Sequence, residues 1–128
     1  SQSIMLITKF LKFLAVGFTG LIIDFTITWI SKEKLKIHKY VSNSLGFIIA
    51  VSSNYYLNRI WTFVSNSSDV FKEYTSFFII AIIGLTINNL FLYLVHERFG
   101  KKFYTSKLIA ILITSFWNFF ANYYYTFS

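Results

Sequence analysis

The chain has 128 residues, of which 55% are hydrophobic, 22% aromatic and only 13% charged. A soluble domain carries about a quarter charged residues, so the composition argues against a soluble fold. Cysteine is absent, which excludes disulfides, thiol nucleophiles and thiolate metal sites. The net charge of +7 comes from cations clustered between apolar runs, a pattern typical of membrane loops near anionic lipid. We therefore expect membrane lipid as a partner and no nucleic acid.

Four apolar runs reach the length of about 20 residues that a membrane-spanning helix needs, at 10–30, 40–63, 74–95 and 108–127. The connections at 31–39, 64–73 and 96–107 are short and polar, so neighbouring helices should be antiparallel. The sequence predicts a single all-α integral membrane domain, 1–128, of four transmembrane helices.

The sequence also contains an internal repeat. Residues 10–63 overlay residues 74–127 at an offset of 64 without a gap, and 12 of these 54 positions are identical. Chance would give roughly four identities in so biased a composition. The best match ends each half, where Asn54, Asn58, Thr62 and Phe63 overlay Asn118, Asn122, Thr126 and Phe127. Each repeat holds two spans, so the halves should be parallel and related by a pseudo-two-fold axis along the membrane normal.

The paired asparagines are candidate functional residues because polar groups inside a membrane are costly. Asn54 and Asn58 lie four residues apart, hence on one helix face, and Asn118 and Asn122 repeat this in the fourth span. About the pseudo-axis the two pairs can converge on one site near the end where the termini lie. The alternative is that each pair only bonds its helices together.

Asp24 is the acidic residue buried within a predicted span, and its repeat mate is Asn88. Lys39 and Lys107 are expected at the same side of the membrane, where pairing with one of them would lower the cost of burying Asp24. The alternative is an ion-linked or proton-linked carboxylate at Asp24, with Asn88 as its neutral counterpart.

Two cations are candidates for binding phosphate. Lys107 directly precedes the fourth span and offers a point charge, although it could equally be a lysine whose ammonium reaches the membrane interface. Arg59 raises the same question at the opposite side, beside Asn58, where a guanidinium could bind phosphate through two bonds.

Motifs of enzymes are not found. The sequence has no nucleophile elbow, phosphate-binding loop, paired-carboxylate site or cluster of metal ligands. We therefore predict a protein that is not an enzyme and that has no metal or cofactor.

Three stretches carry a resemblance to a known family: Phe-Leu-Ala-Val-Gly at 13–17 with Asp24, Asn-Tyr-Tyr-Leu-Asn-Arg-Ile-Trp-Thr-Phe at 54–63, and Lys107 with Trp-Asn-Phe-Phe-Ala-Asn at 117–122. Together they resemble the GtrA-like family of small membrane proteins, over essentially the whole chain. Family members often keep an arginine and a tryptophan near the end of the second half. Tyr123 to Tyr125 stand here instead, so a phosphate role of Arg59 has no symmetric partner.

The resemblance implies translocation of a polyprenyl-phosphate-linked monosaccharide, typically undecaprenyl-phosphate glucose, across the bacterial cytoplasmic membrane. The sugar would decorate cell-surface polysaccharide such as O-antigen or teichoic acid, with membrane glycosyltransferases of the same pathway as partners. Four helices leave little room for an enclosed pathway, which favours a groove or a homodimer interface.

Two other functions stay open: a small proton-coupled exporter, and a non-transporting scaffold for a glycosyltransferase. Against the exporter, its carboxylate should lie near mid-membrane, and Asp24 is expected closer to one end. The orientation is also open. Cations are more numerous in the loops 31–39 and 96–107, which the positive-inside rule places in the cytoplasm, whereas the resemblance implies cytoplasmic termini.

Overall fold

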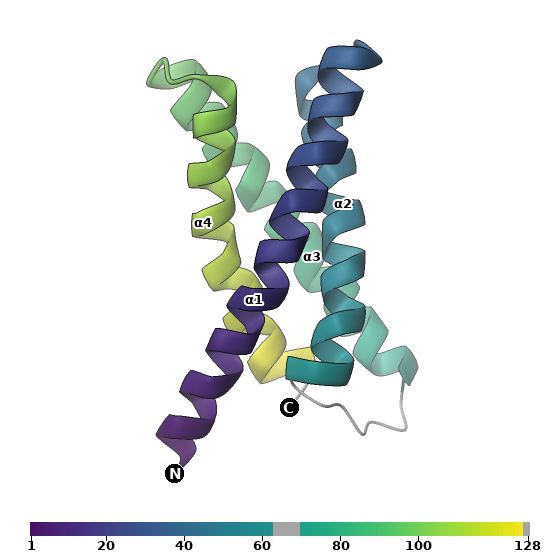
Figure 1. Ribbon diagram of the computed structural model, residues 1–128, viewed down its shortest axis with the longest axis vertical. Helices are drawn as coiled ribbons and strands as arrows, with labels where there is room; N and C mark the ends of the chain where they lie inside the picture. Colours follow the sequence, from purple (N-terminus) through teal and green to yellow (C-terminus); the bar gives the residue numbers. More distant parts are fainter. Residues whose placement is uncertain (63–69, 127–128) are drawn as a thin grey trace.

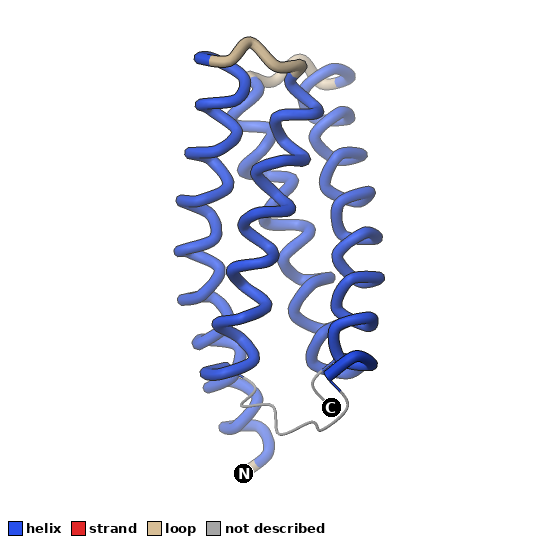
Figure 2. Tube along the Cα trace, turned by 90° about the vertical axis from the view of Figure 1, so that its right-hand side faces the viewer, coloured by secondary structure: helices blue, strands red, loops and turns tan. Residues whose placement is uncertain are grey.

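A computed structural model describes residues 1–62 and 70–126, and these fold as a bundle of four long helices (Figures 1 and 2). The helices are α1 (Gln2–Trp29), α2 (Lys39–Leu57), α3 (Val70–Tyr93) and α4 (Phe103–Ala121). Each continues into a π-helical turn, namely η1 (Ile30–Lys34), η2 (Asn58–Thr62), η3 (Leu94–Arg98) and η4 (Asn122–Thr126). The prediction of four helices is confirmed.

The internal repeat is confirmed by the recurrence of structure at the same offset. Helix α2 and turns η1 and η2 recur, residue for residue at both ends, as α4, η3 and η4, displaced by the offset of 64. The turns that follow η1 and η3 match as well, because Lys36 (φ 59°) and Gly100 (φ 70°) both adopt the left-handed conformation. Phe63 and Phe127, the last residues of the two repeats, lie outside the described residues.

Some helix boundaries differ from the predicted ones. Helix α1 begins at Gln2 instead of residue 10, with the Ser1 hydroxyl accepting a bond from the amide of Ile4 (3.3 Å). Helix α4 begins at Phe103, ahead of the predicted start at 108. Lys107 therefore lies inside a helix and not in a loop, which changes what its side chain can reach.

The four helices pack as two antiparallel pairs, α1 with α2 and α3 with α4, and the two pairs contact each other mainly through α2 and α3. Helix α1 lies along α2 and α3 lies along α4, while α2 approaches α3 more closely than α1 approaches α4. Large aliphatic and aromatic side chains face outward on all four helices, whereas the interior holds buried Asp, Asn, Ser, Thr and Lys side chains. This reversal of the soluble pattern suits a protein surrounded by lipid. By length and apolar composition, two of the four described helices, α1 with η1 and α3 with η3, pass the test for a membrane span.

Candidate functional site

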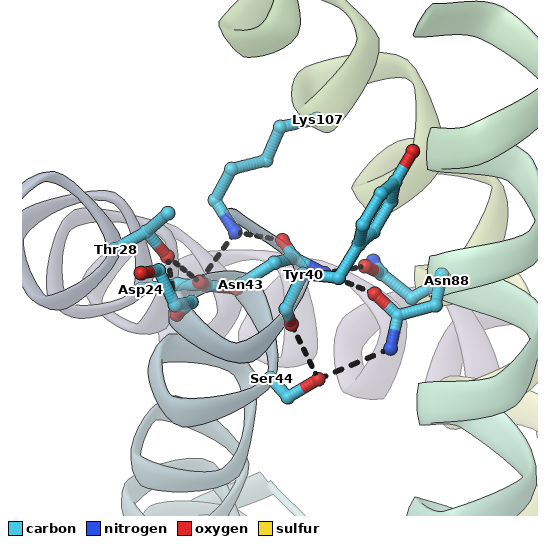
Figure 3. A network of polar contacts seen from close by, with 9 residues as sticks. Asp24, Thr28, Tyr40, Asn43, Ser44, Asn88 and Lys107 are labelled. Atoms are coloured by element: carbon cyan, nitrogen blue, oxygen red, sulfur yellow. Dashed lines mark hydrogen bonds and ion pairs between the residues drawn. The ribbon is translucent and has the colours of Figure 1, made fainter. Parts of the chain in front are cut away.

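A buried ion pair connects α1 to α4 in the interior of the bundle (Figure 3). The Lys107 Nζ lies 2.6 Å from Asp24 Oδ1, which also accepts a bond from the Thr28 hydroxyl at 3.2 Å. Lys107 is 0% exposed and Asp24 is 4% exposed. The ammonium also lies 5.2 Å from the centre of the Phe25 ring, a favourable cation–π position. Of the alternatives left open by the sequence, Asp24 pairs with Lys107, and the Lys107 ammonium lies in the interior of the bundle and not at the membrane interface.

The ion pair continues into a network of amides. Lys107 Nζ also donates to Asn43 Oδ1 at 2.6 Å. The amide nitrogen of Asn43 donates in turn to Asn88 Oδ1 (2.9 Å) and Asn89 Oδ1 (2.8 Å) on α3. The Asn89 amide donates to the Ser44 hydroxyl at 3.1 Å. The network thus connects all four helices through bonded polar groups, as burial requires.

This network lies on the pseudo-two-fold axis. Lys107 and Asn43 are repeat mates, 64 residues apart, and a contact between equivalent residues places the axis between them. About that axis, the pair Lys107–Asp24 corresponds to the pair Asn43–Asn88. One half of the site is therefore charged and the other neutral. The side that carries lysine is also the side where the helices lie further apart, so the longer side chain bridges a wider gap.

Next to the network, a cavity of about 90 Å³, measured for the centres of water-sized molecules, lies between the helices. Its polar lining residues are one carboxylate, five amides and two hydroxyl side chains: Asp24, Asn54, Asn58, Asn88, Asn118, Asn122, Thr114 and Ser115. The phenyl rings of Phe13, Phe47 and Phe77 are also part of the wall. The structure therefore brings both predicted asparagine pairs, together with Asp24 and Asn88, to one cavity.

Two polar atoms in this wall have no hydrogen-bond partner within the described residues, the Oδ1 of Asn54 and the Nδ2 of Asn88. The second asparagine of each pair does have a partner for its side-chain oxygen. Asn58 Oδ1 accepts a bond from the Thr62 hydroxyl (2.6 Å), and Asn122 Oδ1 accepts one from the Thr126 hydroxyl (2.7 Å). A buried acceptor and a buried donor without partners cost free energy unless water or a ligand bonds to them.

Glycines let the neighbouring helices approach these polar groups. A Cβ at Gly20 would lie 2.5 Å from Asn54 Oδ1, and one at Gly84 would lie 2.8 Å from Asn118 Oδ1. These two contacts are repeat mates. A Cβ at Gly46 would lie 2.5 Å from Asp24 Oδ1. Gly20, Gly46 and Gly84 therefore allow close approach of neighbouring helices, whereas a Cβ at Gly17 would meet nothing within 4 Å.

At the end of the bundle away from the N-terminus, two equivalent bonds join the repeats. The Tyr40 hydroxyl donates to Glu97 (3.3 Å), and its mate Tyr104 donates to Glu33 (3.0 Å). Lys39 also bonds Glu97 at 2.6 Å. Lys39, a candidate partner of Asp24, is therefore used elsewhere.

Arg59 lies outside the cavity wall. Its Nε donates to Glu73 Oε1 at 2.8 Å, and the Tyr55 hydroxyl donates to the same oxygen at 3.0 Å. Glu73 is 3% exposed, so the pairing compensates a buried carboxylate. The predicted grouping of Arg59 with the four asparagines is not found, and neither Arg59 nor Lys107 has a nitrogen in the wall of the cavity.

Sequence reasoning missed several groups that build the site. Among them are Asn43, which bonds to Lys107, and Glu73, which pairs with Arg59. The threonines at Thr28, Thr62 and Thr126 each follow a buried Asp or Asn by four residues and donate to it. That spacing was a readable signal, because residues four apart share one helix face.

Within the described residues there is no group of three His, Cys, Asp or Glu side chains that could hold a metal ion. What the arrangement offers is a small polar compartment inside an apolar bundle. These features define a small all-α integral membrane protein with four transmembrane helices, built from a parallel repeat.

The family model described as GtrA/DPMS, transmembrane domain, matches residues 12–127, and the chain belongs to this family. Membership identifies it as a membrane protein related to polyprenyl-phosphate sugars and glycosylation. No curated protein matches the chain, and no solved structure matches it either.

Proposed function

We propose that this protein moves a polyprenyl-phosphate-linked sugar, of the undecaprenyl-phosphate type, across the bacterial cytoplasmic membrane. The sugar would then be used to glycosylate cell-surface polysaccharide or teichoic acid. Family membership supports the class of substrate. The observation that carries the proposal is the cavity lined by Asp24 and five asparagines from all four helices of an otherwise apolar bundle.

The physical problem in such transport is the polar head of the lipid. Moving a hydroxyl from water into hydrocarbon without a hydrogen-bond partner costs about 4–8 kcal/mol, and a sugar has several hydroxyls. A wall of amides can replace the lost water, while the polyprenyl chain remains among the lipid tails. Transport of this kind needs no chemical step, so we propose a carrier and not an enzyme.

The length of the polar wall fits this role. On α2 and η2 the lining residues run from Phe47 to Asn58, and on α4 and η4 they run from Ile111 to Asn122. Each stretch rises roughly 16 Å at 1.5 Å per residue, which is about half of the 30 Å hydrocarbon core. A head group in the cavity would thus have crossed much of the apolar layer.

Glycosyltransferases on the two faces of the membrane are the proposed partners, one loading the lipid carrier and the other consuming the product. The lateral opening that the lipid tail requires would be a groove on one protomer or an interface between two copies.

The test is transbilayer movement in liposomes that contain the purified protein and a labelled polyprenyl-phosphate hexose. We expect the labelled lipid to reach the opposite leaflet faster than in protein-free liposomes. The matched variants are Asn118→Ala, which removes a cavity amide, and Thr86→Ala, which changes an exposed hydroxyl bonded only to its own helix. Movement should slow in the first and not in the second. No acceleration by the unmodified protein would reject transport and favour a scaffold for a glycosyltransferase.

A further inference from the structure

We infer that the central cavity binds the sugar of the lipid substrate, as a neutral and hydroxyl-rich group, and that it does not bind the phosphate. That the substrate is a lipid-linked sugar rests on the proposed function. The inference adds which part of the lipid enters the cavity and which sugars it accepts.

The first argument is the distribution of charge around the cavity. Among the described residues of the wall, Asp24 is the one ionised side chain, and no lysine or arginine contributes. Lys107 lies behind it, fully buried, with bonds to Asp24 and Asn43. The ion pair is therefore a dipole with its negative end at the cavity. A phosphate would meet a carboxylate there and find no cation to pair with, which disfavours its entry.

The second argument is the complementarity of the unbonded polar atoms. Asn54 Oδ1 needs a donor, and Asn88 Nδ2 needs an acceptor. A sugar hydroxyl provides both in one group, whereas an ionised phosphate ester provides only acceptors. Water can occupy these positions when the cavity holds no ligand.

The third argument is the shape and the apolar part of the wall. Phe13 and Phe77, which are repeat mates, present rings to the same cavity, together with Phe47. The carbon–hydrogen face of a pyranose is apolar and packs against such rings, while its hydroxyls point toward the amides. The volume of about 90 Å³ is roughly six to nine times the space that one water needs, which suits a single sugar ring and not a polyprenyl chain.

These arguments also predict selectivity among sugars. A hexuronic acid brings a carboxylate that Asp24 would repel, so the cavity should prefer neutral sugars.

The absence of cysteine makes a direct test of occupancy simple. Ser115 lies in the cavity wall, so Ser115→Cys provides a single thiol there, and the exposed Ser52→Cys provides a reference thiol outside it. The rate of thiol labelling is measured in detergent with three probes. They are a short-chain prenyl-phosphate hexose, the same prenyl phosphate without sugar, and a prenyl-phosphate hexuronic acid.

We expect the hexose probe to slow labelling of Ser115→Cys about tenfold at a concentration ten times its dissociation constant. The other two probes should leave that rate unchanged, and none should affect Ser52→Cys. Adding Asn54→Ala should weaken protection by the hexose about 2- to 10-fold, as loss of one hydrogen bond predicts, whereas Thr86→Ala should not. Equal protection by the sugar-free prenyl phosphate would overturn the inference, and so would the absence of protection by the hexose.

The result is separable from the liposome experiment. Transport of the hexose lipid together with protection by prenyl phosphate alone would reject the sugar site and leave the proposed function standing. Sugar-dependent protection without transport would support the sugar site and reject the proposed function.

Discussion

The pairing of Asp24 with Lys107 makes a quantitative prediction about stability. The Asp24→Asn variant leaves a buried ammonium without its counter-ion, and Lys107→Met leaves a buried carboxylate without its counter-ion. Removing one partner of a buried pair typically costs about 3–5 kcal/mol, because the remaining charge is still out of water. We expect each single variant to lose stability of this order.

The double variant Asp24→Asn/Lys107→Met should behave differently, because it buries no charge. Methionine is similar to lysine in length and flexibility, and an asparagine at 24 can still accept the bond from Thr28. Replacing both members of a buried pair by neutral groups is often close to neutral for stability. The double variant should therefore be more stable than either single variant.

The assay is equilibrium unfolding of the four purified proteins in mixed detergent micelles, analysed as a double-mutant cycle. A loss in the double variant equal to the sum of the two single losses would refute the reasoning, since it would mean that the two charges do not interact. Unaltered stability of Lys107→Met alone would refute it as well.

Three further predictions concern backbone contacts and the ends of the helices. Gly46→Ala should lower the unfolding free energy by about 1–3 kcal/mol, because the added Cβ would collide with α1. Gly17→Ala should lower it by less than about 1 kcal/mol, because the added Cβ would meet nothing within 4 Å. Gly100→Ala should lower stability by about 1 kcal/mol through its φ of 70° alone, and Lys36→Gly should not lower it. Both pairs are measured by the same unfolding assay. Glu97→Gln should lower the thermal midpoint at low ionic strength, because it removes the charge that pairs with Lys39 at 2.6 Å, and its difference from the unmodified protein should shrink as salt is added. A difference that grows with added salt would contradict this prediction.

The sequence was sufficient for the architecture because the signals were long and repeated. Four apolar runs of membrane length and an offset of 64 predicted the helices, their parallel repeat and the pseudo-axis, and the structure repeats α2 as α4 at that offset. The convergence of Asn54, Asn58, Asn118 and Asn122 on one cavity followed from the same symmetry.

The sequence raised the pairing of Asp24 with Lys107 as one alternative, but it did not predict how deeply Lys107 is buried or which residue pairs with Arg59. Lys107 was expected at an interface because apolar content alone placed the start of the last span after it, whereas α4 begins at Phe103. Glu73, the partner of Arg59, is the last residue of the predicted connection 64–73, so the sequence alone leaves Arg59 available for phosphate. Such pairings depend on how helices far apart in sequence are placed. The repeat did indicate the pairing of Asp24 with Lys107. Asp24 aligns with the neutral Asn88 and Lys107 with the neutral Asn43, so the two positions that gain a charge gain opposite charges.

The central claim is that the amide-lined cavity carries the polar head of a lipid-linked sugar through the membrane. The most direct measurement is the rate of transbilayer movement of a polyprenyl-phosphate hexose in liposomes containing the unmodified protein, Asn54→Ala/Asn118→Ala or Thr86→Ala. The account predicts rapid movement with the unmodified protein and Thr86→Ala, and much slower movement with the double cavity variant at equal incorporation and folding. Equal rates for all three proteins would contradict it.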